Sequence, residues 1–216
     1  MSHITLIRHG QANTQARDEA SYDALSDLGH QQAAWLGAYL RDTGSHYSRI
    51  YCGTLTRHIE TAASMGCTDV VQDPRLNEME YFTLAEAMRD QHGLPIPQER
   101  EGFIDHLPRV FAAWAAGDIA DPYESWEAFE TRTQQALAEI AEGEGPALVI
   151  TSGGLISMAM RQSLALNTTA MARLALAVMN TSMHRLFPIG GHFSPVLFNA
   201  VPHLDTPERQ FAQTHL

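Results

Sequence analysis

The stretch Ile4-Thr5-Leu6-Ile7-Arg8-His9-Gly10 decides how the fold of this chain is interpreted. Its apolar and β-branched residues predict a short buried strand that ends in an arginine, a histidine and a glycine. In open α/β sheets, ligands bind just beyond the carboxyl ends of the strands. Arg8 and His9 are therefore expected to project into such a crevice, while Gly10 allows the backbone to turn tightly.

Helical and strand patterns alternate along the rest of the chain, which predicts an α/β fold. Pro195 indicates that the last strand lies at an edge of the sheet. We expect a single domain over residues 1–216, with a mainly helical insertion at about 79–123. The expected strands are 49–52, 70–71, 147–151, 183–189 and 193–198, and the expected helices are about 27–43, 83–91, 103–115, 126–142, 153–165 and 169–176, with another beginning at 54–56.

Composition limits the classes of partner. The chain has 216 residues, 44% of them apolar, which is enough to bury a sizeable core. It carries 14 basic and 25 acidic residues, a formal net charge of −11. Nucleic acids and anionic membranes select basic surfaces, so neither is an expected partner. Any phosphate site must then be a local basic pocket on an acidic body.

Cysteine usage and hydrophobic runs bear on the cellular setting. Cys52 and Cys67 are the only cysteines, and their spacing suggests neither a metal site nor a disulfide framework. The first residues run directly into the predicted strand, without a recognisable targeting segment. No apolar run approaches the roughly 20 residues that cross a bilayer. We therefore expect a soluble, cytoplasmic protein.

Three later segments carry companions of Arg8 and His9. Arg57 lies in the segment Thr54-Leu55-Thr56-Arg57-His58-Ile59-Glu60-Thr61-Ala62, Glu78 ends Arg75-Leu76-Asn77-Glu78, and Ser152-Gly153-Gly154 follows the predicted strand 147–151. In order and spacing these segments resemble the histidine phosphatase superfamily, the phosphoglycerate-mutase-like phosphatases. The resemblance runs from about Ile4 to about His203, nearly the whole chain.

The resemblance implies a three-layer α/β sandwich with a mostly parallel central sheet. It also implies a metal-independent phosphatase that hydrolyses a small phosphomonoester through a phosphohistidine on His9, with no cofactor. Arg8 and Arg57 then clamp the phosphate, since guanidinium groups supply fixed positive charge. A separate acid must protonate the leaving oxygen, and this role falls to Glu78.

Ser152 departs from the family pattern, because it stands where the family usually has its second histidine. A serine keeps one donor but is shorter and uncharged, so a catalytically weak or inactive phospholigand-binding protein is the alternative. A phosphomutase is a third, less favoured interpretation. Either His184 or His203 could substitute for the missing histidine. A second departure is Gln15, at the position of a family asparagine.

The surroundings of these residues are also predicted. The Arg57 side chain is expected in the first turn of a helix, where free N–H groups favour an anion. His58 beside it points elsewhere, and we interpret it as structural or surface. Gly153 and Gly154 allow a phosphate to approach the start of the next helix. The polar segment 11–25 is expected to be a loop over the pocket mouth.

The helical insertion at about 79–123 is expected to form a lid that faces the substrate. Its second helix carries an apolar stripe with helical spacing, which we interpret as core and not as a binding surface. The stripe consists of Leu107, Val110, Phe111 and Trp114.

Overall fold

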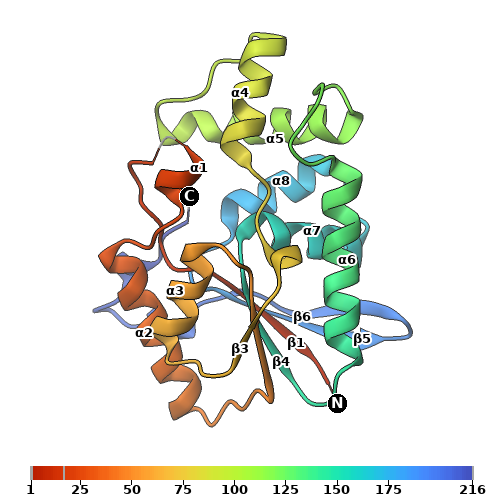
Figure 1. Cartoon of the computed structure of the whole chain (residues 1–216). Coiled ribbons are helices and arrows are strands. Elements are labelled where there is room, and N and C mark those ends of the chain that lie inside the picture. Colours follow the sequence, from red (N-terminus) through yellow and green to blue (C-terminus); the bar gives the residue numbers. More distant parts are fainter. Residues whose placement is uncertain (1, 17, 216) are drawn as a thin grey trace.

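A computed structural model describes residues 2–16 and 18–215 of the chain. Its centre is a six-stranded sheet in the order β3-β2-β4-β1-β5-β6 (Figure 1). The first four strands of this order run parallel to one another, β5 runs antiparallel to β1, and β6 runs antiparallel to β5. The strands are β1 (Ile4–Arg8), β2 (Arg49–Cys52), β3 (Val70–Gln72), β4 (Ala147–Thr151), β5 (Met183–Ile189) and β6 (His192–Ala200).

Helices cover both faces of the sheet and lie above the carboxyl ends of the parallel strands (Figure 1). The predicted α/β fold with a mostly parallel sheet is therefore confirmed. The helices are α1 (Glu19–Tyr22), α2 (Asp27–Asp42), α3 (Thr56–Met65), α4 (Tyr81–His92), α5 (Arg100–Ala116), α6 (Trp126–Glu142), α7 (Gly153–Leu164) and α8 (Thr168–Ala177), with 3-10 turns at Pro74–Leu76, Pro202–Leu204 and Gln210–Ala212.

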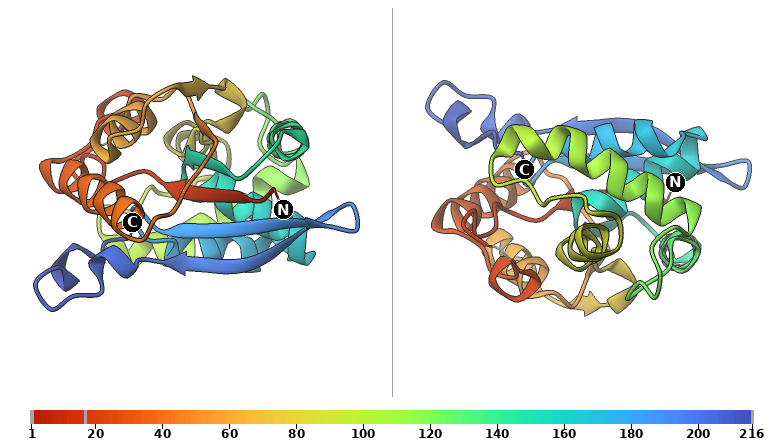
Figure 2. Two further views of the ribbon diagram at one scale, coloured as in Figure 1. Left: turned by 90° about the horizontal axis from the view of Figure 1, so that it is seen from below. Right: turned by 90° about the horizontal axis from the view of Figure 1, so that it is seen from above.

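The pleat of β1 and β4 divides the core into two layers. Ile7 and Leu148 pack against α2 and α3, whereas Leu6 and Val149 pack against α6 and α7. Successive side chains of a strand point to opposite faces, and both faces here are covered by helices. Because both faces are buried, the sequences of these two strands are nearly continuous apolar runs. The sheet is seen between its two helical layers in Figure 2.

A third apolar cluster lies beyond the carboxyl ends of the strands. It joins α4 and α5, which lie in the predicted helical insertion, to α7 and α8. Val110, Phe111 and Trp114 of the predicted α5 stripe are buried in this cluster. In Figure 2, the view from above shows α5 lying across this end of the molecule. The cluster fixes the insertion over the edge where ligands of α/β sheets bind.

The structure confirms the predicted edge strand and corrects the predicted loop. The last strand, β6, lies at the edge of the sheet, as the proline at position 195 indicated. Ser26 and Ser125 cap α2 and α6 by accepting bonds from backbone N–H groups. The segment 11–25 differs from the expected loop, because it contains α1, with Asp18 accepting from the N–H of Ser21 as its cap.

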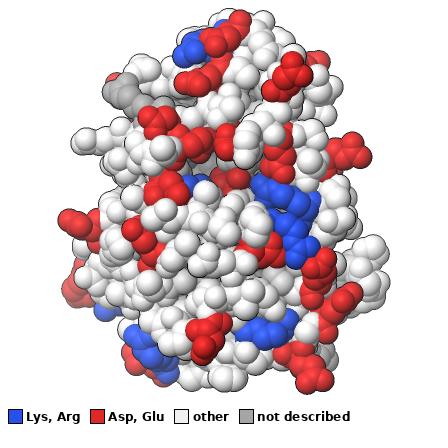
Figure 3. All heavy atoms as spheres, viewed as in Figure 1, with Lys and Arg blue, Asp and Glu red and all other residues white. Residues whose placement is uncertain are grey.

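The surface reflects the composition. Figure 3 shows carboxylates spread over one face of the molecule, with basic groups in smaller clusters. Across residues 2–16 and 18–215, no helix combines the length and apolar character needed to cross a membrane.

Candidate active site

Two neighbouring strands bring side chains to the same edge of the sheet. β1 and β4 pair in parallel with Arg8 opposite Thr151, so His9 and Ser152 each follow directly after a paired strand end. The N–H of His9 donates to the Thr151 carbonyl at 2.8 Å. Because of the pleat, Arg8 lies against the start of α7 while His9 lies toward α3.

His9 is buried, with 1% of its surface exposed. Its Nδ1 lies 2.7 Å from the Gly10 carbonyl oxygen, which can only accept, so the ring proton is on Nδ1. No hydrogen bond within the described chain engages Nε2. Burial, followed by the charges of Arg57 and Arg8, holds the pKa of His9 well below its ordinary value. His9 is thus a neutral imidazole whose Nε2 lone pair is free.

A cavity of about 910 Å³ opens beside His9. Arg8, Arg57 and Glu78 all contribute to its wall. His9 and Ser152 lie behind this wall, with the His9 ring 6.2 Å from the ring of Tyr22, which also lines the cavity. The four sequence segments that carry the predicted site residues therefore converge at one end of one cavity.

Arg57 is almost fully buried, in the first turn of α3. Its Nη1 donates to Asp23 Oδ1 at 3.0 Å, and its guanidinium lies over the Tyr22 ring at 5.0 Å. Asp23 also accepts from the backbone N–H groups of Thr56 and Arg57, at 2.9 and 3.2 Å. The start of α3 was expected to favour a bound anion; instead, a carboxylate of the chain itself occupies these N–H groups.

A different set of contacts holds Arg8. It donates from Nη1 to the carbonyl of Val178, and its Nε lies close to Gly153. The Nε atoms of Arg8 and Arg57 are both buried without a hydrogen-bond partner. Each guanidinium thus keeps unused donor capacity while forming part of the cavity wall, and an anion is the natural complement of such a pair.

Glu78 follows the 3-10 turn Pro74–Leu76, and the turn is tied to the sheet by Thr151, whose hydroxyl donates to Leu76 O at 2.6 Å. Its carboxyl group accepts from Gly154 N at 2.9 Å and from Met79 N at 3.2 Å. A Cβ at Gly154 would lie 2.3 Å from Glu78 Oε1, so glycine leaves room for this carboxyl group. Burial raises the pKa of Glu78 above its ordinary value despite these hydrogen bonds and both arginines.

His58 corrects an expectation from the sequence. It was interpreted as structural or surface, and the structure excludes the surface alternative, because His58 is fully buried with its Nε2 2.6 Å from Ser152 Oγ. Its ring centroid is 5.7 Å from that of His9. Burial, with the nearby Arg57 charge, holds the pKa of His58 well below its ordinary value, so His58 is neutral. Ser152 therefore has an imidazole partner that comes from α3.

His184 and His203, the two histidines considered as substitutes, are engaged elsewhere. His184 Nε2 pairs with Ser182 Oγ at 2.8 Å, and its Nδ1 accepts from the N–H of Asn199. His203 Nε2 pairs with Thr181 Oγ1 at 2.8 Å. Both imidazoles are bound to other groups, and neither contributes to the cavity wall.

The start of α7 is only partly as expected. Gly153 lines the cavity and lies against Arg8, but the N–H of Gly154 donates to Glu78. The same N–H is therefore not free for a phosphate. Gln15, at the position of the family asparagine, also lines the cavity.

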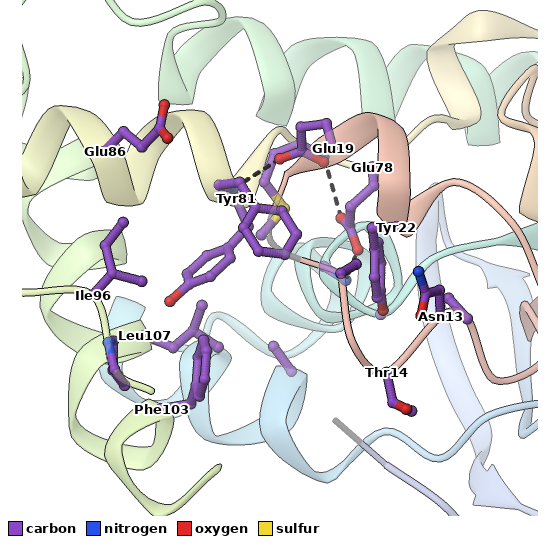
Figure 4. Close-up of a pocket in the computed structure, with 18 of the residues that line it drawn as sticks. Asn13, Thr14, Glu19, Tyr22, Glu78, Tyr81, Glu86, Ile96, Phe103 and Leu107 are labelled. Carbon is purple, nitrogen blue, oxygen red and sulfur yellow. Dashed lines mark hydrogen bonds between the residues drawn. The ribbon is translucent and has the colours of Figure 1, made fainter. Parts of the chain in front are cut away.

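Two residues of α1 belong to the site, although the sequence did not single them out. Tyr22 covers Arg57, and Glu19 accepts from the N–H of Phe82 at 2.8 Å (Figure 4). Burial raises the pKa of Glu19 to about 7. A polar segment without hydrophobic periodicity gives no signal for such a short helix.

The apolar stripe of α5 has two functions where one was expected. Leu107 and Phe111 are buried in the core as predicted, yet both also line the cavity. The interpretation of the stripe as core alone was therefore too narrow.

Side chains that could bind a metal ion do not cluster in the part of the chain that the structure describes. Among the residues that the structure describes, no group of three or more histidine, cysteine, aspartate or glutamate side chains is arranged to hold a metal ion.

Fold and site together define the class of protein. A neutral histidine and two buried arginines lie at the carboxyl edge of a mostly parallel sheet in a phosphoglycerate-mutase-like fold. The sequence model of the histidine phosphatase superfamily (branch 1) matches residues 4–201. The chain belongs to this superfamily.

Individual relatives agree with this assignment. A phosphoserine phosphatase mutant from Entamoeba histolytica, solved with phosphoserine, superimposes with a TM-score of 0.70 at 18% identity, covering 94% of this chain and 100% of that one. A phosphoglycerate mutase from Bacillus anthracis gives a TM-score of 0.67 at 22% identity, covering 94% of both chains. The zebrafish (Danio rerio) fructose-2,6-bisphosphatase TIGAR B is 32% identical over an alignment of 100 residues that covers 41% of this chain and only 38% of the relative.

The position of Asp23 generates a prediction about stability. Asp23→Ala removes the carboxylate that caps α3 and pairs with Arg57, so we expect the free energy of unfolding to fall by about 1–2 kcal/mol. Asp23→Asn keeps an oxygen acceptor for the N–H groups and should lose less than the alanine variant. Urea denaturation of the three proteins measures both changes. Equal losses in both variants would show that the capping bonds contribute little.

Proposed function

We propose that this protein is a metal-independent phosphatase that hydrolyses a phosphomonoester through a phosphohistidine on His9. The observation that carries the proposal is a neutral, buried His9, with a free Nε2, beside two arginines at the end of a cavity. Membership of the histidine phosphatase superfamily supports it.

The first step transfers the phosphoryl group to the protein. His9 Nε2 attacks phosphorus, the bond from phosphorus to the ester oxygen breaks, and Glu78 donates its proton to the departing oxygen. Arg8 and Arg57 balance the negative charge on the equatorial oxygens. In the second step a water attacks the phosphohistidine, Glu78 takes its proton, and phosphate and free His9 result.

The protonation states that burial favours for His9 and Glu78 suit these two reaction steps. A nucleophile must be deprotonated and an acid must be protonated before the reaction begins. Burial lowers the pKa of His9 and raises that of Glu78, because it disfavours the charged form of each group. The two shifts run in the directions that the two proposed roles require.

Ser152 and His58 are proposed to act as a unit. A serine hydroxyl that accepts from His58 Nε2 has its own proton free for a phosphoryl oxygen. The distance of 2.6 Å between Ser152 Oγ and His58 Nε2 supports the pairing of the two residues. Ser152 then donates to the substrate, and His58 is a positioning residue that acts through it.

A catalytically weak or inactive phospholigand-binding protein is the alternative function, and Ser152 is the observation that favours it. Such a protein uses the same arginines to hold a phosphate without breaking its ester bond. A phosphomutase is less favoured, since it also needs a second substrate group to be recognised.

His9→Ala separates the phosphatase from the binding protein. We expect the variant to lose at least about 10³-fold in kcat on an aryl phosphate, because no second nucleophile replaces the imidazole. The natural protein should also form an acid-labile phosphoenzyme that the variant does not form. Phosphate release and rapid-quench trapping measure the two effects, with the exposed-site variant His46→Ala as control. Tight phosphate binding without turnover in either protein would identify the binding protein.

Glu78→Gln tests the proposed acid through its dependence on the leaving group. An alkoxide needs a proton as it departs and a nitrophenolate does not, so we expect kcat to fall about 10²–10⁴-fold on an alkyl phosphate and much less on p-nitrophenyl phosphate. Steady-state kinetics on both substrates measure the difference. An equal loss on both would mean that Glu78 shapes the site without transferring a proton.

A double-mutant cycle tests the unit of Ser152 and His58. We expect Ser152→Ala to lower kcat by about 10²-fold, as the loss of one preorganised donor does. His58→Ala should also lower kcat, and the double variant should be no slower than Ser152→Ala, because His58 acts through the hydroxyl. Urea denaturation provides the separate stability readout. Losses in kcat that multiply would show that the two residues act independently.

A further inference from the structure

The cavity is much larger than its phosphate end requires. Arg8, Arg57 and Glu78 occupy only one end of the 910 Å³. The remaining space is called the outer chamber here. Its wall is formed by α4, α5 and the connecting segment 93–98. A volume near the upper end of the roughly 300–1,000 Å³ of small-molecule pockets leaves room for a substantial organic group attached to the phosphate.

The wall of the outer chamber is mostly apolar. In Figure 4, the side of the cavity opposite Glu78 and Tyr22 is lined by Tyr81, Ile96, Phe103 and Leu107. The Tyr81 and Phe103 rings lie 5.9 Å apart. Apolar and aromatic walls of this kind stabilise a ligand by removing its apolar surface from water.

The aromatic wall is held in place before any ligand enters. Tyr81 Oη bonds with His106 Nδ1 at 2.8 Å, so its ring is fixed against α5. Phe111, deeper in the wall, is fully buried and packs against Trp114. A preformed surface loses little conformational entropy when it binds a flat apolar group.

The charges in the outer chamber do not match a second phosphate. The carboxyl group of Glu86 lines the outer chamber, and Arg89 is the cation that lines it among the side chains that the structure describes. Arg89 is already paired with Asp90 at 2.7 Å and is half exposed. A second phosphate placed here would meet the carboxyl group of Glu86 and an arginine that already has an acidic partner.

We propose that the substrate is an ester with one phosphate and a bulky, mainly aromatic body that fills the outer chamber. The far end of this body is uncharged or cationic, because it lies near Glu86. This inference rests on the proposed function, since it places the phosphate between Arg8 and Arg57. It assigns substrate selection to the insertion between β3 and α6.

Two phosphates with the same kind of leaving group test the proposal. Ethyl phosphate and 2-(2-naphthyl)ethyl phosphate both release a primary alkoxide, so their difference in kcat/KM reports the organic body and not the chemistry. We expect kcat/KM to be at least about tenfold higher for the naphthyl ester, as burial of its rings predicts. Fructose 2,6-bisphosphate serves as the substrate with two phosphates, and it should be hydrolysed less efficiently than the naphthyl ester.

Two neighbouring residues of α5 provide matched variants. Phe103 lines the cavity, whereas Ile104 is 59% exposed to solvent. Phe103→Ala should remove most of the advantage in kcat/KM that the naphthyl ester has over ethyl phosphate. Ile104→Ala should change kcat/KM for neither substrate. A naphthyl advantage that survives in Phe103→Ala, or one that is lost equally in Ile104→Ala, would overturn the assignment to the outer chamber.

Binding to His9→Ala separates this inference from the proposed function. Calorimetric titration of that variant with the two monoesters and the bisphosphate needs no turnover. Tighter binding of the naphthyl ester than of the other two supports the substrate class even where the natural protein hydrolyses none of them, in which case only the proposed function fails. Binding or hydrolysis that favours the bisphosphate overturns the substrate class and leaves the phosphatase proposal standing.

Discussion

The parallel pairing of β1 with β4 is the constraint on which the site depends. It sets Arg8 opposite Thr151, so that His9 and Ser152 leave the sheet together at its carboxyl edge. The pleat then separates Arg8 from His9, which places the guanidinium against α7 and the imidazole against α3. A slip of one residue in β1 would exchange these two side chains, and the cavity would lose both its anchors at once.

Burial at this edge has opposite effects on two groups of the site. It holds the pKa of His9 low and that of Glu78 high, because each group avoids charge in surroundings of low polarity. The two arginines assist the first shift and oppose the second, yet burial is the larger cause for both groups. Burial therefore favours a free lone pair on His9 and a proton on Glu78, while the permanent charge resides on the guanidinium groups of Arg8 and Arg57.

The sequence predicted those parts of the site that depend on local pattern. Short apolar runs predict where strands end, so the sequence alone places Arg8, His9 and Ser152 at one edge of the sheet. His58 could not be placed in this way. The rule that neighbours on a helix face different directions correctly separated it from Arg57, but only the packing of α3 against β4 decides that its direction leads to Ser152. Glu19 likewise depends on a contact with Phe82, 63 residues away.

The pairing of Ser152 with His58 also shows why a departure from a family pattern is best judged in three dimensions. Read along the chain, a serine in place of a histidine is the loss of an imidazole. In the fold, His58 Nε2 approaches to 2.6 Å from the serine oxygen, so a larger side chain at position 152 would overlap the His58 ring. The small residue that follows β4 and the large residue on α3 are therefore complementary in volume and in hydrogen bonding. A second imidazole therefore still lies close to His9, but it belongs to His58 of α3 and not to position 152.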